Sequence, residues 1–384
     1  MESLIRNIAT KEERDPQMSF RQQQQRECHD SRDVDNDLRR IIEDIQARIL
    51  VIGVGGAGNN AVTRLNQTGI VGAITLSANT DAQQLLYSHS HKKLLLGRDL
   101  CRGLGAGNDP QIGAEAAEES GETLKDILSK VDMCFIVCGL GGGTGTGAAP
   151  VIARLAKNLG VLTVAICTLP FEVEGRIKAK NAREGLRRLY ECSDTTIVVP
   201  NEKLIEIAPD LSLKEAFLVA DEILIRAVKG LTELINRPGD VNVDFADVRR
   251  VLGEGGAAII GLGESNSQEN RAKEAVEDAL TNPLLDVDIR TAKSVLLNIT
   301  GGKDLNLKQT EEVIRAVTDQ LSSDIIVKFG VIIDPDLQGK IRATIVVSGV
   351  RSPYIMSNFG AESTPNTMDY DLAEDLDLGL DTIE

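Results

Sequence analysis

The chain has 384 residues, which suits two average domains, and 42% of them are hydrophobic, as in an ordinary globular protein. Its formal net charge of −16 excludes the usual nucleic-acid-binding proteins, because binding to phosphate backbones depends on a basic surface. No stretch reaches the roughly 20 apolar residues of a membrane span, and the polar N-terminus has no signal-peptide core. We therefore predict a cytoplasmic protein without direct membrane insertion.

The cysteines and histidines do not indicate a metal centre. Six cysteines occur without paired zinc spacings, and three of them lie in apolar runs typical of buried strands, so we predict reduced, structural thiols. The three histidines have no neighbouring cysteine or carboxylate arrangement, which argues against histidine-based catalysis. We predict no metal site built from protein side chains.

The N-terminal region is predicted to be a disordered extension followed by one helix. Residues 1–34 are polar, include four consecutive glutamines and show no apolar period. Leu38, Ile41, Ile42 and Ile45 then recur at helical spacing, which predicts an amphipathic helix leading into the first strand.

From residue 35 to 210, short β-branched runs alternate with helical segments. Such an alternation predicts an α/β fold in which a parallel sheet carries helices on both faces. Ligands of these sheets bind at the carboxyl ends of the strands, and turn-rich sequences follow the strands here. The predicted strands are 49–52, 73–77, 133–138, 162–167 and 196–199.

The first glycine-rich loop, at residues 53–58, directly follows a predicted strand and opens a helix. Its glycines let the backbone approach phosphate oxygens, and the N-terminus of the helix favours their negative charge. Alone, the loop would fit a nicotinamide or flavin enzyme about as well, with Asp81 as the acid that binds the ribose. A plain tight turn without a ligand is a further alternative.

A second loop, at 139–147, makes a polyphosphate ligand the better explanation. Between residues 141 and 147 it contains five glycines and the hydroxyl groups of Thr144 and Thr146. Successive backbone N–H groups at the start of a helix form an anion-binding nest, and this composition is hard to explain as packing or as a flexible turn.

Two further segments should converge on the same edge of the sheet. One is the glycine-rich loop at 103–108, and the other is Asn79-Thr80-Asp81 at the end of the second predicted strand. Several such loops together indicate a triphosphate. The absence of a G-x-x-x-x-G-K-[ST] sequence excludes a Walker-type NTPase.

The second half of the chain begins with a long apolar-striped helix at 212–235, which should pack between two domains. The region 257–350 mixes predicted strands and helices and forms a second, α+β domain. The last segment, 351–384, has eight acidic residues and one basic residue, so we predict a flexible, solvated tail.

Five motifs, at 53–62, 79–83, 103–108, 141–147 and 242–247, closely resemble in their order and spacing those of the FtsZ family, the bacterial and archaeal relatives of tubulin. The match runs from about residue 47 to 350, whereas tubulin itself is less similar. The resemblance is to the archaeal type. Bacterial members usually end in a short apolar peptide with proline and basic residues, and none is found here, so the partners of bacterial members are not carried over.

The resemblance implies a Rossmann-like parallel-sheet GTPase domain at 35–210, a long central helix at 211–236 and a smaller α+β C-terminal domain at 237–350. It also implies GTP and GDP as ligands, with Mg²⁺ held mainly by phosphates and water. On this mapping the nucleotide-binding residues are Gly55, Gly56, Ala57, Gly58, Asn59, Asn60, Asp81, Ala106, Gly107, Gly142, Gly143, Thr144, Gly145, Thr146, Glu174, Lys178, Asn201, Phe217 and Asp221.

Within this set, the resemblance places Glu174 at the ribose and Asn201, Phe217 and Asp221 at the guanine. Phe217 and Asp221 are four residues apart on one helix, so one could cover a base while the other accepts from its N–H edge. An ordinary half-exposed helix acid is the alternative for Asp221. Lys178 stands where many family members have Arg, which keeps the charge but loses a bidentate fork.

The catalytic loop implied by the resemblance spans 240–247 and contains Asn242, Asp244 and Asp247. Supplied to the nucleotide of a neighbouring subunit, these carboxylates could orient and polarise the attacking water. The same residues would also suit a helix N-cap with an acidic first turn, and both interpretations can hold.

The family further implies head-to-tail homopolymers at the division site and, through the acidic tail, a division-site anchor or regulator protein as a partner. Two other functions compete with this one. The first is a nicotinamide-dependent oxidoreductase, which would leave 141–147 and 242–247 unexplained. The second is a nucleotide-binding regulator of the same fold that assembles poorly.

Overall fold

A computed structural model gives the fold of the chain. The residues that the structure describes are 47–207, 210, 212–237, 239–253, 256–267, 270–281, 291–321, 325–350 and 354. The predicted extension at 1–34, the predicted helix over residues 38–45 and, apart from residue 354, the predicted tail at 351–384 lie outside these residues.

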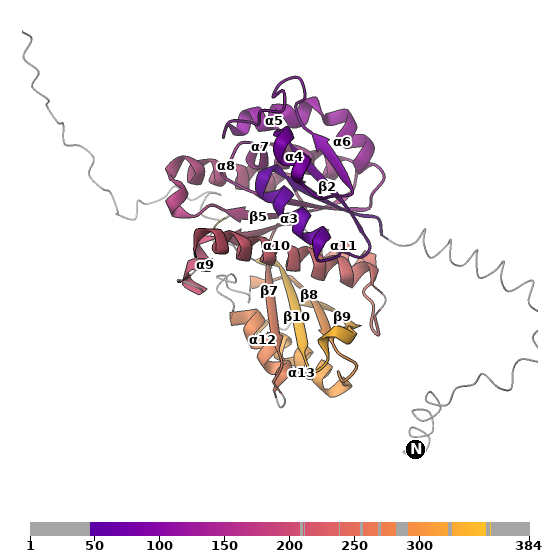
Figure 1. Cartoon of the computed structure of the whole chain (residues 1–384). Helices are drawn as coiled ribbons and strands as arrows, with labels where there is room; N and C mark the ends of the chain where they lie inside the picture. Colours follow the sequence, from indigo (N-terminus) through magenta and orange to yellow (C-terminus); the bar gives the residue numbers. More distant parts are fainter. Residues whose placement is uncertain are drawn as a thin grey trace, which may run out of the picture.

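Ten strands form one continuous sheet through the centre of the molecule (Figure 1). Their order is β3-β2-β1-β4-β5-β6-β7-β10-β8-β9, and within the described chain β10 alone runs antiparallel to its neighbours. The strands are β1 (Ile49–Val54), β2 (Ala73–Asn79), β3 (Lys92–Leu95), β4 (Met133–Gly139), β5 (Leu162–Leu169), β6 (Thr195–Pro200), β7 (Gly256–Ser265), β8 (Ser294–Gly301), β9 (Ile326–Ile333) and β10 (Ile341–Val350).

The central strands are apolar throughout because helices cover both faces of the sheet. In β1 every residue is buried, with Leu50 and Ile52 in one hydrophobic cluster and Ile49 and Val51 in the other. The predicted α/β class is confirmed. The helices are α3 (Gly55–Gln67), α4 (Ala82–Tyr87), α5 (Pro110–Glu119), α6 (Gly121–Leu128), α7 (Thr144–Asn158), α8 (Arg176–Cys192), α9 (Glu202–Ile207), α10 (Leu213–Asn236), α11 (Phe245–Gly253), α12 (Arg271–Thr281) and α13 (Leu307–Thr318).

The two faces of the sheet have different helices. The apolar sides of α3, α10 and α11 pack on one face, and those of α5, α6, α7, α8, α12 and α13 pack on the other. In Figure 1 the region from β1 to α8 forms one lobe and the region from β7 to β10 forms the other, with α10 running between them. The two halves of the sheet join through only three β6–β7 residue pairs.

The helix α10 connects opposite edges of the sheet. It begins after Ser212, whose side chain accepts from Glu215 N while the Glu215 carboxylate accepts from Ser212 N, a capping box. Its 24 residues give a length of about 36 Å. At its far end Asn236 donates to the carbonyl oxygens of Ala47 and Gly72, which lie just before β1 and β2. The end of α10 therefore lies at the amino edge of the parallel strands.

The described cysteines are free, and Cys134, Cys138 and Cys167 lie buried in β4 and β5, as predicted for structural thiols. Burial raises the pKa of each of these three thiols. No helix within the described ranges is both long and apolar enough to cross a membrane.

Candidate active site

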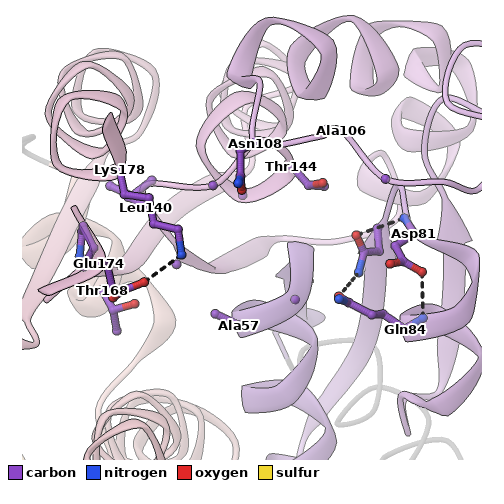
Figure 2. A pocket seen from close by; sticks show the side chains of 18 of the residues that line it. Ala57, Asp81, Gln84, Ala106, Asn108, Leu140, Thr144, Thr168, Glu174 and Lys178 are labelled. Carbon is purple, nitrogen blue, oxygen red and sulfur yellow. Dashed lines mark hydrogen bonds and ion pairs between the residues drawn. The ribbon is translucent and has the colours of Figure 1, made fainter. Parts of the chain in front are cut away.

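A cavity of about 510 Å³ lies at the carboxyl edge of the parallel strands, a volume suited to a nucleotide (Figure 2). Loops after β1, β2, β4, β5 and β6 contribute to its wall, together with the start of α10. Most of the predicted nucleotide-binding residues line it, namely Gly56, Ala57, Asp81, Ala106, Gly107, Gly142, Gly143, Thr144, Gly145, Glu174, Lys178, Asn201, Phe217 and Asp221.

The other five predicted residues lie behind or beside the wall. Gly55 is the first residue of α3 and has a φ of 72°, and Asn60 is exposed away from the cavity lining. A Cβ on Gly58 would overlap the carbonyl oxygen of Val137, so this glycine lets α3 pack closely on β4.

Thr146 and Asn59 are the remaining two. Thr146 Oγ1 accepts from Gly141 N at 2.8 Å, and this hydrogen bond shapes the loop from behind. Asn59 is buried, and neither polar atom of its side chain has a hydrogen-bond partner among the described residues. Burying an amide without partners is costly, so this position fits a polar ligand.

The helices that point at the cavity have free N-terminal N–H groups. Both α3 and α7 begin at the wall, have no side-chain cap and have no acidic residue in their first turn. By contrast, Asp81 caps α4 and Asp109 caps α5. The first N–H groups of α3 and α7 are thus available to an anion, and the dipoles of both helices favour one.

The glycines of the 139–147 loop divide into two groups. Gly142, Gly143 and Gly145 line the cavity, where backbone N–H groups can reach a phosphate, whereas Gly147 does not line it. A Cβ on Gly145 would approach the carbonyl oxygen of Gly139, and one on Gly147 would overlap that of Pro110 in α5. The expectation that packing could not explain this glycine run is therefore wrong for Gly147, which lets α5 and α7 cross closely.

Sequence reasoning missed several residues of the cavity wall. Gln84 lies opposite the Glu174 side of the cavity and accepts from Asn79 Nδ2 at 3.1 Å (Figure 2). It lies one residue beyond the 79–83 motif, and this nearness was the available signal. Asn108 has a φ of 62°, a left-handed conformation that Asn accepts more readily than most residues.

The predicted guanine-binding residues lie together where α10 begins. The Phe217 ring is 39% exposed and meets the Phe171 ring edge to face, with centroids 5.3 Å apart. Burial raises the pKa of Asp221 to about 6, and the nearby Arg64 only partly opposes this shift. Asn201 Oδ1 is buried without a hydrogen-bond partner in the described chain.

Glu174 and Lys178 form an ion pair on one side of the cavity, with Nζ 3.0 Å from Oε2 (Figure 2). Glu174 also accepts from Phe171 N at 2.9 Å, which holds the turn before α8. These contacts place both charged groups in the wall, next to the segment that carries the aromatic residues.

The predicted catalytic residues do not line the cavity. Asp244 is exposed, Asn242 Oδ1 accepts from Gly239 N at 2.7 Å, and Asp247 pairs with Lys328 at 2.9 Å. The following helix α11 lies at the amino edge, because Arg249 donates to the carbonyl oxygens of Gly160 and Asp132 ahead of β5 and β4.

The cavity and the catalytic loop therefore occupy opposite edges of the sheet. Asp221 lines the cavity, and Asn236 lies 15 residues later at the other edge, about 22 Å away along α10. No group of three or more His, Cys, Asp and Glu side chains that could hold a metal ion occurs within the described part of the chain.

Two known protein families match the two halves of this chain. The Tubulin/FtsZ family GTPase domain matches residues 48–209, and the FtsZ family C-terminal domain matches residues 256–351. The cell division protein FtsZ 1 of Thermococcus kodakarensis is 54% identical over 331 residues, covering 86% of this chain and 88% of that protein.

Solved structures agree with the sequence matches. An empty FtsZ dimer from M. jannaschii has a TM-score of 0.78 and 52% identity, covering 82% of this chain and 91% of that chain. CetZ2 from Haloferax volcanii, solved as a GTPγS-bound protofilament, has a TM-score of 0.69 and 26% identity, and the match covers 81% of this chain and 96% of that chain. These matches leave no support for a nicotinamide-dependent oxidoreductase. The chain is a GTPase that binds GTP and GDP, and it belongs to the FtsZ family within the tubulin/FtsZ group.

Proposed function

We propose that this chain assembles head to tail and hydrolyses GTP at the interface between successive subunits. Asp244 and Asp247 of one subunit would act on the nucleotide held by the next. The observation that carries this proposal is the placement of the cavity and the catalytic loop on opposite edges of the sheet. Stacking two copies edge to edge would bring one subunit's loop to the other's cavity.

The chemistry follows from the two halves of this shared site. The N-termini of α3 and α7, with Gly142 and Gly143, would hold the phosphates and stabilise the charge that develops on the transferred phosphoryl group. Mg²⁺, held by the phosphates and water, would neutralise part of that charge. Asp244 and Asp247 would orient the attacking water from the other side, and Asn242 would position their loop.

Exposed apolar side chains at the nucleotide edge support an interface there. Leu104 is 85% exposed and lines the cavity, and Val173 and Ile177 are 78% and 76% exposed on either side of Glu174. Burying such residues under a second subunit would stabilise the assembly at about 25 cal/mol for each Å² of apolar surface removed from water.

The cellular role is proposed from the relatives. The Thermococcus protein is named for cell division, and the M. jannaschii and Haloferax structures are described as a dimer and a protofilament. We propose that this chain forms the division ring in the cytoplasm, and that its acidic tail recruits an anchor or regulator protein.

Specific GTP turnover should rise with protein concentration above a threshold, because one subunit holds only half of the catalytic machinery. Steady-state phosphate release from dilute monomer to tens of micromolar protein, with light scattering in parallel, would measure this. A rate per subunit that stays constant at every concentration would contradict the shared site. Turnover without scattering would favour the alternative of a regulator that assembles poorly.

Deleting residues 355–384 should leave turnover and filament formation largely intact while removing a cellular partner from pull-downs. The tail is strongly acidic and has no sustained apolar period, so it is not expected to contribute to the core. A large fall in turnover, or an unchanged set of captured partners, would count against this role.

A further inference from the structure

Three basic residues of α8 form what we call the cationic stripe: Arg176, Lys180 and Arg183. They are spaced four and three residues apart, so they lie along one face of the helix, away from the buried Leu186 and Leu189. All three are exposed. None of them makes an ion pair with another residue of the described chain.

The other basic side chains of α8 do have acidic partners. Lys178 pairs with Glu174, and Arg187 and Arg188 both pair with Glu184, at 2.7 and 3.0 Å. The chain has 58 acidic residues against 42 basic ones, so carboxylates are not scarce. The stripe is a local excess of positive charge on an otherwise acidic protein.

This arrangement is unfavourable for α8 itself. Arg176 is the first residue of the helix, where the helix dipole disfavours a cation, and no acidic residue lies in the first turn. Like charges three and four residues apart further destabilise a helix. An anionic ligand lying along this face would relieve both penalties.

The chain leaves the described fold beside the other end of α8. The last strand, β10, ends at Val350 and pairs with β7. A Cβ on Gly256, the first residue of β7, would lie 3.9 Å from Tyr190 Oη in α8 and 4.0 Å from Gly349 Cα in β10. The tail therefore starts close to the helix that carries the stripe.

The tail has the charge and the length to cover the stripe. Residues 351–384 contain eight acidic residues and one basic residue, and leucines such as Leu372 and Leu376 alternate with the acids. The 17 residues of α8 span about 25 Å, whereas the thirty residues after Tyr354 can extend to about 100 Å.

We propose that the acidic tail, residues 355–384, binds the cationic stripe of its own subunit. The complex is held by ion pairs between tail carboxylates and Arg176, Lys180 and Arg183. Because Arg176 directly follows the turn that carries Glu174, the bound tail lies next to the nucleotide edge where the neighbouring subunit would dock.

Zero-length carbodiimide cross-linking of the full-length chain, at concentrations that keep it monomeric, tests this contact. Lys180 carries the only amine of the stripe, so links between Lys180 and tail carboxylates should dominate the mass-spectrometric map. Their yield should fall by about fivefold or more in 0.5 M salt, because screening weakens exposed ion pairs. The double variant R176E/R183E keeps the Lys180 amine and should show a similar fall.

A matched control, K92E/R98E, makes the same change in charge at exposed positions outside α8 and should leave the Lys180 yield unchanged. Tail links spread evenly over exposed lysines such as Lys92 and Lys273 would overturn the proposal, and so would the absence of Lys180 links. Mixing isotopically light and heavy chains identifies links between copies, whose dominance would overturn binding within one subunit. The wild-type map provides this test whether or not a variant folds.

Discussion

Replacing Asp244 with Ala is expected to lower GTP turnover by about 100-fold or more while GTP affinity stays nearly unchanged, and Asp247→Ala should act in the same way. Both residues lie at the amino edge of the sheet, away from the cavity of their own subunit, so their loss removes water activation without removing nucleotide contacts. Filaments should persist longer, because GTP remains uncleaved. Phosphate release and equilibrium binding of labelled GTP measure the two quantities separately.

Controls for this experiment lie in the same loop. Asp240 is also an exposed acid, and Asp240→Ala should keep near-wild-type turnover. Asp247→Asn keeps the size of a side chain that pairs with Lys328, so it separates lost chemistry from lost packing. A loss of nucleotide affinity in proportion to activity would show that these residues belong to their own subunit's site.

Mixed filaments provide a sharper test of the shared site. In Gly143→Val the new side chain would collide with Ala106 and the backbone of Asp109, which should close the phosphate loop. This variant keeps Asp244, whereas Asp244→Ala keeps the cavity. Each should be nearly inactive alone, and their mixture should recover part of the activity. No recovery in mixtures that still form filaments would refute catalysis between subunits.

Asp221→Asn is expected to weaken GTP binding by about 1–3 kcal/mol, the cost of losing a charged hydrogen-bond partner of guanine. Xanthosine triphosphate, which has a carbonyl where guanine has its amino group, should lose much less or gain affinity, because Asn can donate to that carbonyl. Equal losses for both nucleotides would remove the guanine role from Asp221.

The raised pKa of Asp221 gives the same prediction a second readout. On the proposed guanine role only the carboxylate form accepts from guanine N–H groups, so GTP affinity should fall about tenfold per pH unit below about 6, relative to Asp221→Asn. Folding stability should depend on pH in the opposite direction from GTP affinity. A raised pKa means that the fold favours protonated Asp221, so the contribution of Asp221 to folding stability is present at low pH and is lost as pH rises through about 6.

The loops of the site could be predicted from sequence because their chemistry is local. Glycines and hydroxyl groups clustered after β-branched runs are typical of helix N-termini that bind anions, and these loops do line the cavity. The apolar stripe likewise predicted α10 to within one residue at each end, at 212–235 against the observed Leu213–Asn236. β3 was missed, because its four residues include two exposed lysines and show no alternation.

The sequence by itself determined the α/β class, the glycine-rich loops that line the cavity and the resemblance to one family, because each of these is carried by short local patterns. The tertiary structure alone decided which glycines face the ligand and which, like Gly147, permit a helix crossing. It also placed Asp221 and Asp244 at opposite edges of the sheet and the end of β10 beside α8. Each of these features depends on how segments that are far apart in the chain lie relative to one another. They arise from strand order, helix length and close packing, which local propensity and periodicity do not encode.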